Sequence, residues 1–214
     1  MSLATRRSSR VLFLASANPG KLREFHAAAR PRGIDVQVLP GFAQLPPCIE
    51  DGNTFEDNAR KKSLHYSAFT SELVFADDSG LSVDALEGAP GVRSARFAGP
   101  NATDDENNRM LLAALHRIER DSSGRPALRP ASQKRAAHYV CVIALAERGR
   151  ILTVVEGRAD GLIVDTPRGS GGFGYDPHFY FPPLNRTFAE LTAEEKFAVS
   201  HRGEAFRRLL EFLI

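Results

Sequence analysis

The chain has 214 residues, 43% of them hydrophobic and 25% charged, and its formal net charge is +2. This length is enough to bury a core without disulfide or metal cross-links. The composition excludes two classes of protein, because a membrane span needs about 20 consecutive apolar residues and a dedicated nucleic-acid-binding protein needs a strong positive field. We therefore expect no membrane partner and no nucleic-acid partner.

The first predicted element has two interpretations. Residues 11–16 form an apolar, β-rich run that follows several arginines and leads into Ala15-Ser16-Ala17, so it could be a secretory signal with an A-x-A cleavage site. The apolar run is at or below the limit for a signal, which usually needs about 7–15 apolar residues. We therefore expect a buried strand that follows a disordered basic tail over residues 1–10.

The cysteine content predicts a reducing compartment. Cys48 and Cys141 are the only two cysteines, and neither has the spacing of a metal site or of a C-x-x-C motif. Free thiols are typical of cytoplasmic proteins, because disulfides form mainly in oxidising compartments. We therefore expect a cytoplasmic protein.

The first half of the chain predicts alternating strands and helices. Strands are expected over residues 11–16, 35–39 and 73–76, with helices after the Pro-Gly break at 19–20 and from Thr54 to about Phe69. Thr54 and Asp57 have the spacing of an N-cap and its reciprocal acid. The third strand is expected to end on the sequence Asp77-Asp78-Ser79-Gly80.

The second half predicts an antiparallel ribbon between helices. Strands are expected over residues 139–146, 151–157 and 162–164, with loops over 122–134 and 169–183. Helices are expected to start at Thr103 and Thr192, each with a glutamate three residues later, and at Ser200. Strands mixed with helices around this ribbon indicate an α/β protein with a mixed sheet.

The loop Ser16-x-Asn18-x-x-Lys21 lies between the first strand and the first helix. A hydroxyl, an amide, an ammonium and the free N–H groups of a helix start can converge there on a phosphate. The spacing is not that of a Walker A loop. The alternative is an ordinary turn in which Asn18 caps the helix and Lys21 is solvated.

Asp77 and Asp78 follow an apolar strand at the edge where ligands bind in open α/β sheets. Successive strand residues point to opposite sides, so we expect only one of the two to face a ligand. Mg²⁺ prefers carboxylate oxygens, and Glu50 could supply a second carboxylate. The alternative is a solvated turn.

Asn58 and Lys62 are four residues apart and therefore share one face of the predicted helix from Thr54. In one interpretation, Lys62 reaches into the cleft as a phosphate ligand. The alternative is that its ammonium extends past the apolar face into solvent.

Residues 170–177 combine three glycines with Phe173, Tyr175 and Asp176. Glycine lets the backbone approach a ligand, and the aromatic rings offer flat surfaces on which a nucleobase can stack. The alternative is an aromatic plug over the core. His201 and Arg202 occupy the first turn of the last helix, where cations oppose the helix dipole unless an acceptor lies nearby.

Five stretches, taken together and in this order, resemble the inosine triphosphate pyrophosphatase family. They are SANPGKLREF, EDGNTFEDNARKK, ADDSGLSVDALEGAPGVRSARFAG, GGFGYDPHF and LTAEEKFAVSHRGEAFRRL. The resemblance implies one domain over residues 11–214, with an elongated mixed sheet flanked by helices and a cleft between two lobes. It also implies a homodimer that hydrolyses non-canonical purine nucleoside triphosphates such as ITP, dITP and XTP to monophosphate and pyrophosphate, with Mg²⁺ as cofactor.

The resemblance also implies roles for residues in these stretches. Asp78 would accept a proton from water and would hold Mg²⁺ together with Glu50. Lys62 would take part in catalysis at the triphosphate. The remaining residues implied to bind substrate are Ser16, Asn18, Lys21, Ser79, Phe173, Gly174, Tyr175, Asp176, Lys196, His201 and Arg202.

Two positions depart from the family pattern, and two other functions stay open. Ala17 stands where the family usually has glycine, and the chain has no tryptophan, which some members carry in the stretch that matches residues 156–161. One alternative is a Maf-like nucleotide pyrophosphatase, whose first loop resembles S-x-S-P-R-R. The other is a nucleotide-binding module without turnover.

Overall fold

The computed structural model describes residues 10–119 and 135–213, and its strands form one mixed sheet. The sheet order is β2-β1-β3-β4-β5-β6-β7; β1 pairs in parallel with β2 and β3, and the other pairs are antiparallel. The strands are β1 (Arg10–Leu14), β2 (Ile34–Val38), β3 (Val74–Val83), β4 (Ala136–Glu147), β5 (Arg150–Ile163), β6 (Phe179–Phe181) and β7 (Arg186–Thr187). The predicted mixed α/β fold is confirmed.

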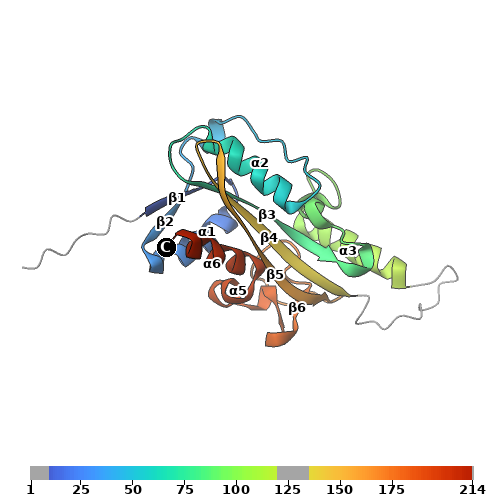
Figure 1. Ribbon diagram of the computed structural model, residues 1–214. Helices are drawn as coiled ribbons and strands as arrows, with labels where there is room; N and C mark the ends of the chain where they lie inside the picture. Colours follow the sequence, from blue (N-terminus) through green and yellow to red (C-terminus); the bar gives the residue numbers. More distant parts are fainter. Residues whose placement is uncertain (1–9, 120–134, 214) are drawn as a thin grey trace, which may run out of the picture.

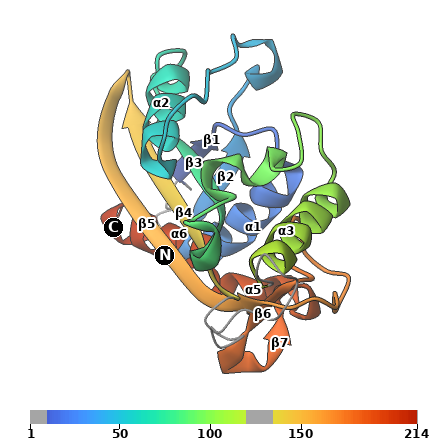
Figure 2. The same cartoon turned by 90° about the vertical axis from the view of Figure 1, so that its right-hand side faces the viewer.

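Helices cover both faces of this sheet. They are α1 (Pro19–Ala29), α2 (Phe55–Ser67), α3 (Asp104–Glu119), α5 (Ala193–Val199) and α6 (His201–Leu213). Helix α2 lies on one side of the long β3–β4–β5 ribbon, and α1, α5 and α6 lie on the other (Figure 1). The β4–β5 pair curves along the molecule from α2 at one end to β6 and β7 at the other (Figure 2). None of the helices in the described ranges is both long and apolar enough to span a bilayer.

The helix starts follow the predicted capping residues. Side chains at each start accept hydrogen bonds from the first-turn N–H groups, which would otherwise lack partners. The capping residues are Asn18, Thr54, Thr103, Thr192 and Ser200. Full capping boxes form between Thr103 and Glu106 and between Thr192 and Glu195, at the predicted spacing.

The core is divided by the sheet. On one face, side chains of α1 and α6 pack with Phe75 of β3 and Ile143 of β4; Phe206 of α6 contacts the rings of Phe25 and Phe75. On the other face, Ala59 of α2 packs on Val142. Burial of a large apolar side chain such as Phe75, Val142 or Phe206 contributes about 1.5–3 kcal/mol, so both faces hold their helices firmly against β3 and β4.

Strand β3 does not end at residue 76, and that prediction is wrong. The strand continues through the Asp77-Asp78-Ser79-Gly80 sequence to Val83, because each of these residues stays paired with β4 as far as Ala137. Turn-forming residue types are overridden here by the antiparallel ladder and by partners that neutralise the buried carboxylates. The paired aspartates therefore lie within a strand.

Strand β5 is also longer than predicted. The expected strands over 151–157 and 162–164 are one continuous strand, with Gly157 and Gly161 inside it. Each glycine allows a close approach: a Cβ at Gly157 would overlap the His201 carbonyl of α6, and one at Gly161 would overlap Phe179. The short strands β6 and β7 were not predicted, since one lies in the expected 169–183 loop.

Two predicted segments fall outside the described residues. The loop over 122–134 is one of them. The other is the predicted basic tail, of which residues 1–9 lie outside the described ranges. Its last residue, Arg10, belongs to β1.

Gly157→Ala should destabilise the protein by about 2 kcal/mol or more, because the added methyl group would force α6 away from β5. The midpoint of urea unfolding, with an unchanged slope, measures the effect. Glu156→Ala, at the exposed neighbouring position, is the control and should change stability by no more than about 0.5 kcal/mol. Equal midpoints for both variants would show that this close approach is dispensable.

Candidate active site

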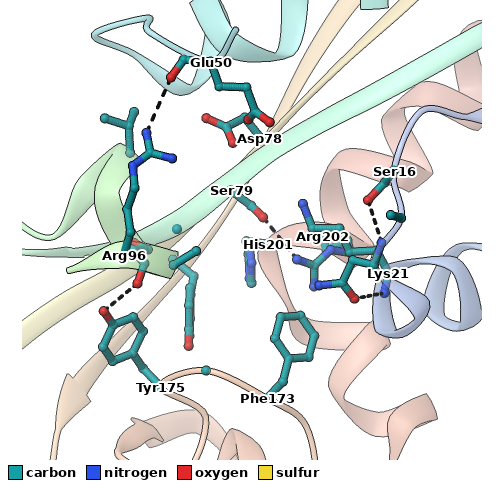
Figure 3. A pocket seen from close by; sticks show the side chains of 18 of the residues that line it. Ser16, Lys21, Glu50, Asp78, Ser79, Arg96, Phe173, Tyr175, His201 and Arg202 are labelled. Atoms are coloured by element: carbon teal, nitrogen blue, oxygen red, sulfur yellow. Dashed lines mark hydrogen bonds between the residues drawn. The ribbon is translucent and has the colours of Figure 1, made fainter. Parts of the chain in front are cut away.

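A cleft opens where β1 ends and β3 continues. Strand β1 pairs with β3 only at Val74 and Phe75, so the next residues of β3 have no strand on that side. The cleft has a volume of about 500 Å³. Every residue proposed from the sequence lines it: Ser16, Asn18, Lys21, Glu50, Lys62, Asp78, Ser79, Phe173, Gly174, Tyr175, Asp176, Lys196, His201 and Arg202. Ten residues of the cleft wall are labelled in Figure 3.

Lys62 joins two carboxylates at one end of the cleft. Its Nζ lies 2.7 Å from Glu50 Oε2 and 3.4 Å from Asp78 Oδ1, and Asn58 donates to the other oxygen of Asp78 at 3.1 Å. The lysine is buried, so its ammonium does not extend into solvent. Asn58 and Lys62 thus act from the shared face of α2 that the sequence predicted.

Burial and ion pairing act in opposite directions on this group. Burial lowers the pKa of Lys62, but the carboxylates of Asp78, Asp77 and Glu50 outweigh it and the pKa is raised. Burial also raises the pKa of Asp78, and Lys62 only partly offsets that effect. Lys62 therefore stays protonated, and Asp78 is a more basic carboxylate than an exposed aspartate.

Asp77 points to the opposite side of β3. Its Oδ2 is 2.8 Å from Lys21 Nζ and 3.9 Å from Arg202 Nε, and the hydroxyl of Ser79 donates to it at 3.3 Å. Burial alone raises a carboxyl pKa, but Lys21, Arg202 and Lys62 hold the pKa of Asp77 below its ordinary value. The expected division between the two aspartates is present, with Asp78 facing α2 and Asp77 facing α1 and α6.

The Ser16–Lys21 loop combines the two roles considered from the sequence. Asn18 Oδ1 caps α1 by accepting from the N–H groups of Gly20 at 2.8 Å and Lys21 at 3.2 Å. Ser16 Oγ accepts from the Asn18 N–H at 3.2 Å. The loop still faces the cleft, and the Lys21 ammonium extends from it toward Asp77.

A second ionic cluster lies at the other end of the cleft. Arg202 Nη1 donates to Glu24 Oε2 at 2.7 Å, and its Nη2 donates to Ser79 Oγ at 3.1 Å. Lys196 Nζ donates to Asp176 Oδ2 at 2.6 Å and lies 3.4 Å from Glu24 Oε1. Both cations lie near the ring of Phe173, at 4.8 Å for Lys196 and 5.3 Å for Arg202.

Asp176 is engaged within the protein. It accepts from Lys196, from the N–H of Phe173 at 2.9 Å and from the hydroxyl of Tyr139 at 3.4 Å. Gly172, at φ +72°, leaves the space that Asp176 occupies. Tyr175 is likewise buried and donates to the carbonyl of Ser94 at 2.8 Å. Both side chains thus fix the shape of the cleft wall in addition to lining it.

Two features remove the expected repulsion between the start of α6 and cations at His201 and Arg202: His201 is neutral, and Arg202 is paired with Glu24. Burial and the nearby Arg202, Lys196 and Lys21 hold the pKa of His201 well below its ordinary value, so its ring is neutral near pH 7. The ring stacks on Tyr139 with centroids 4.6 Å apart. Within residues 10–119 and 135–213, buried His201 Nδ1 and Arg202 Nε have no hydrogen-bond partner, although Arg202 Nε lies 3.9 Å from Asp77 Oδ2.

Sequence reasoning missed two residues of this site. Glu24 lies three residues after Lys21 on α1 and joins Lys196 to Arg202. Its position within SANPGKLREF was the available signal. Arg96 ends the short helix η4 (Gly91–Arg96) and lines the cleft near Glu50. Arg96 lies within the stretch ADDSGLSVDALEGAPGVRSARFAG, which was its available signal, although no local pattern sets it apart from Arg93 in the same stretch.

The carboxylates suit a divalent cation that the substrate helps to bind. The carboxylates of Glu50 and Asp78 both contact the Lys62 ammonium, so their oxygens lie close to the same point in the cleft. Within residues 10–119 and 135–213 no group of three or more His, Cys, Asp or Glu side chains is placed to hold a metal. Mg²⁺ commonly binds one or two carboxylates with water and substrate phosphates, and this donor set fits that pattern.

The sequence model of the Ham1 family matches residues 12–212. The chain belongs to the Ham1 family. It is 47% identical over 206 residues to a dITP/XTP pyrophosphatase of Desulforamulus reducens, covering 94% of both chains. The structure is similar to that of a HAM1 protein from Coxiella burnetii, with a TM-score of 0.80, 40% identity and coverage of 95% of this chain and 98% of that one. It is also similar to the structure of a nucleoside-triphosphatase or dITP/XTP pyrophosphatase from Mycobacterium abscessus. The TM-score is 0.66 and the identity 39%, and the match covers 95% of this chain and 96% of that one.

Glu24→Gln should destabilise the protein by about 3 kcal/mol at pH 7, because Arg202 would keep a buried charge without its carboxylate. Although burial favours the neutral acid, Arg202 and Lys196 hold the pKa of Glu24 below its ordinary 4.5. A lowered folded-state pKa stabilises above the unfolded pKa, and this contribution is lost as pH falls through the folded value. The difference between the variant and the wild type should therefore shrink below about pH 4.

Urea unfolding at pH 7 and at pH 3–4 measures this effect. The control is Glu194→Gln on α5, which removes an exposed carboxylate and should leave stability unchanged at both pH values. A Glu24→Gln variant as stable as the wild type at pH 7 would contradict the assignment.

Proposed function

We propose that this Ham1 protein hydrolyses non-canonical purine nucleoside triphosphates, including dITP, XTP and ITP, to nucleoside monophosphates and pyrophosphate. Such a hydrolase removes damaged purines from the nucleotide pool. The observation that carries the proposal is the Lys62 centre, where one buried ammonium joins Glu50 and Asp78. The names of the Desulforamulus reducens and Mycobacterium abscessus proteins, both dITP/XTP pyrophosphatases, support the substrate class.

The residues at this end of the cleft suit a triphosphate. Lys21 and Lys62 offset its negative charges, which would otherwise repel Glu50 and Asp78. A bound divalent cation, with Mg²⁺ as the expected ion, would be held by Glu50 and Asp78 and would neutralise phosphate charge. Asp78 then accepts a proton from the attacking water as the bond between the α- and β-phosphates breaks. Its raised pKa suits this role, because a more basic carboxylate takes the proton more readily.

The opposite end of the cleft suits a 6-oxopurine. Arg202 lies 5.3 Å from the ring of Phe173, on which a base can stack, and His201 lines the same cleft with a buried nitrogen that has no partner among the described residues. A donor that faces O6 would meet the amino group of adenine instead, leaving a buried polar group unpaired at a cost of about 1–3 kcal/mol. Guanine shares O6, so discrimination against GTP needs a further contact at its 2-amino group.

The same proposal includes the protein's organisation. Residues 11–214 would act as one bilobed domain, supported by the single continuous sheet. The homodimer is a prediction from family resemblance, and sedimentation equilibrium tests it. Both cysteines are free thiols, which supports a cytoplasmic enzyme.

The wild-type protein should release pyrophosphate from dITP, XTP and ITP with Mg²⁺, and should turn over ATP and GTP much more slowly. The assay quantifies pyrophosphate separately from orthophosphate. Release of orthophosphate alone, or equal turnover of ATP, would contradict the proposal. Tight binding without turnover would favour a nucleotide-binding module, and a preference for non-purine substrates would favour a Maf-like enzyme.

Asp78→Asn should lower kcat for dITP at least about 100-fold, because an amide cannot accept the proton. In the wild type, kcat should fall as pH falls through the pKa of Asp78, which burial places above its ordinary value, since only the ionised carboxylate acts as base. Circular dichroism checks folding, and Asp84→Asn, an exposed aspartate outside the cleft, is the control. Near-normal turnover by Asp78→Asn would remove it from the mechanism.

A further inference from the structure

The cations of the cleft differ in whether a carboxylate already neutralises them. Four are in ion pairs: Lys21 with Asp77, Lys62 with Glu50 and Asp78, Lys196 with Asp176, and Arg202 with Glu24. Arg96 differs, since no carboxylate in the described part of the chain lies within 4.0 Å of its guanidinium. Its one side-chain hydrogen bond goes to the carbonyl oxygen of Glu50, at a long 3.5 Å. Arg96 is therefore an unneutralised positive charge beside the metal-binding carboxylates.

The backbone that carries Arg96 is held firmly although the side chain is exposed. Ser94 is buried, and its hydroxyl accepts from the N–H of Leu81 in β3 at 2.9 Å, while its carbonyl accepts from Tyr175 at 2.8 Å. Asn107 of α3 donates to the carbonyl of Ala95 at 3.2 Å and accepts from the N–H of Ala98 at 2.9 Å. Gly80 leaves room for this contact, because a Cβ there would overlap Ser94.

These anchors come from three different parts of the fold, namely β3, α3 and the 173–176 loop. They fix the backbone before Arg96 at Ser94 and Ala95 and the backbone after it at Ala98, and Arg96 lines the cleft between them. An exposed side chain on a well-anchored backbone costs less conformational entropy to order on binding than one on a free loop. The arrangement suits a group that is solvated before substrate enters and is immobilised when it does.

Arg96 and Lys21 lie on opposite sides of Ser79 in the close view, with Glu50 and Asp78 between them toward the upper end (Figure 3). A polyphosphate bound at the two carboxylates would therefore lie between Lys21 on one side and Arg96 on the other. A guanidinium can donate two parallel hydrogen bonds to phosphate oxygens, which an ammonium cannot. Substrate would also exclude water from this part of the cleft and strengthen the attraction.

We propose that Arg96 binds the polyphosphate of the substrate from the side opposite Lys21 and remains in contact with the departing pyrophosphate. The proposal rests on the function proposed above and adds a substrate-binding residue to it. The paired cations contribute little net charge, so Arg96 supplies positive charge that the carboxylates have not already offset. It faces the phosphates and not the base, because its guanidinium reaches Glu50, whereas Phe173, His201 and Arg202 lie away from Glu50 (Figure 3).

The test compares Arg96→Gln and Arg96→Lys with Arg93→Gln. Arg93 is an exposed arginine of the same short helix that does not line the cleft, so it is a matched control for loss of one surface charge. The measurements are kcat and KM for dITP, and the dissociation constants of pyrophosphate and of IMP by calorimetry in the presence of Mg²⁺. Thermal unfolding verifies that each variant is folded.

Arg96→Gln should weaken pyrophosphate binding about 10- to 100-fold, the range expected for lost hydrogen bonds to a charged group. It should lower kcat/KM for dITP by a similar factor and leave IMP binding within about twofold of the wild type. Arg96→Lys should recover part of the loss, because it restores charge without the paired donors. Arg93→Gln should match the wild type.

Two outcomes would overturn the proposal while the wild type is active. One is unchanged pyrophosphate affinity and kcat/KM in Arg96→Gln, and the other is an equal loss of pyrophosphate and IMP binding, which would indicate a general change of the cleft. A wild-type protein that releases no pyrophosphate from dITP would instead contradict the proposed function, so the two failures are distinguishable.

Discussion

The site depends on one constraint, which is that two adjacent carboxylates lie inside the paired strand β3. Buried charge is costly unless it is paired and hydrogen-bonded. Because neighbouring strand residues point to opposite sides, the two carboxylates form ion pairs with different cations. Asp77 is neutralised by Lys21 of α1 and Arg202 of α6, and Asp78 by Lys62 of α2. Segments far apart in the sequence are thereby held around the point where β1 ends.

The same constraint separates the roles of the two aspartates. Cations on its side of the sheet hold the pKa of Asp77 low, so it is a permanent anion that positions Lys21. Asp78 retains a raised pKa because burial outweighs its partners, and it faces Glu50, with which it can share a cation. Two carboxylates whose environments shift their pKa values in opposite directions are characteristic of acid–base sites. In the proposed reaction, one aspartate is structural and the other takes the proton.

The cleft is also differentiated from end to end. Near Glu50 the lining is ionic, while near Phe173 it offers an aromatic ring and polar atoms that have no partner in the described part of the chain. Asp176 holds that second end in shape through bonds to Lys196 and to the Phe173 backbone. A nucleotide has the same division into a charged phosphate chain and a flat base with a few polar atoms, so the cleft and the proposed substrate correspond in chemistry.

The sequence by itself determined the helix starts, the mixed α/β class and most of the charged residues that line the cleft, because caps and ordered motifs are local signals. It also predicted that Asp77 and Asp78 diverge, which follows from strand geometry alone. Only the tertiary structure decided that β3 continues through these residues, that Glu24 joins Lys196 to Arg202, and that Arg96 has no carboxylate partner among the described residues. These features depend on which distant side chains meet, and pairing between strands and packing of helices set that outcome, which no short stretch of sequence encodes.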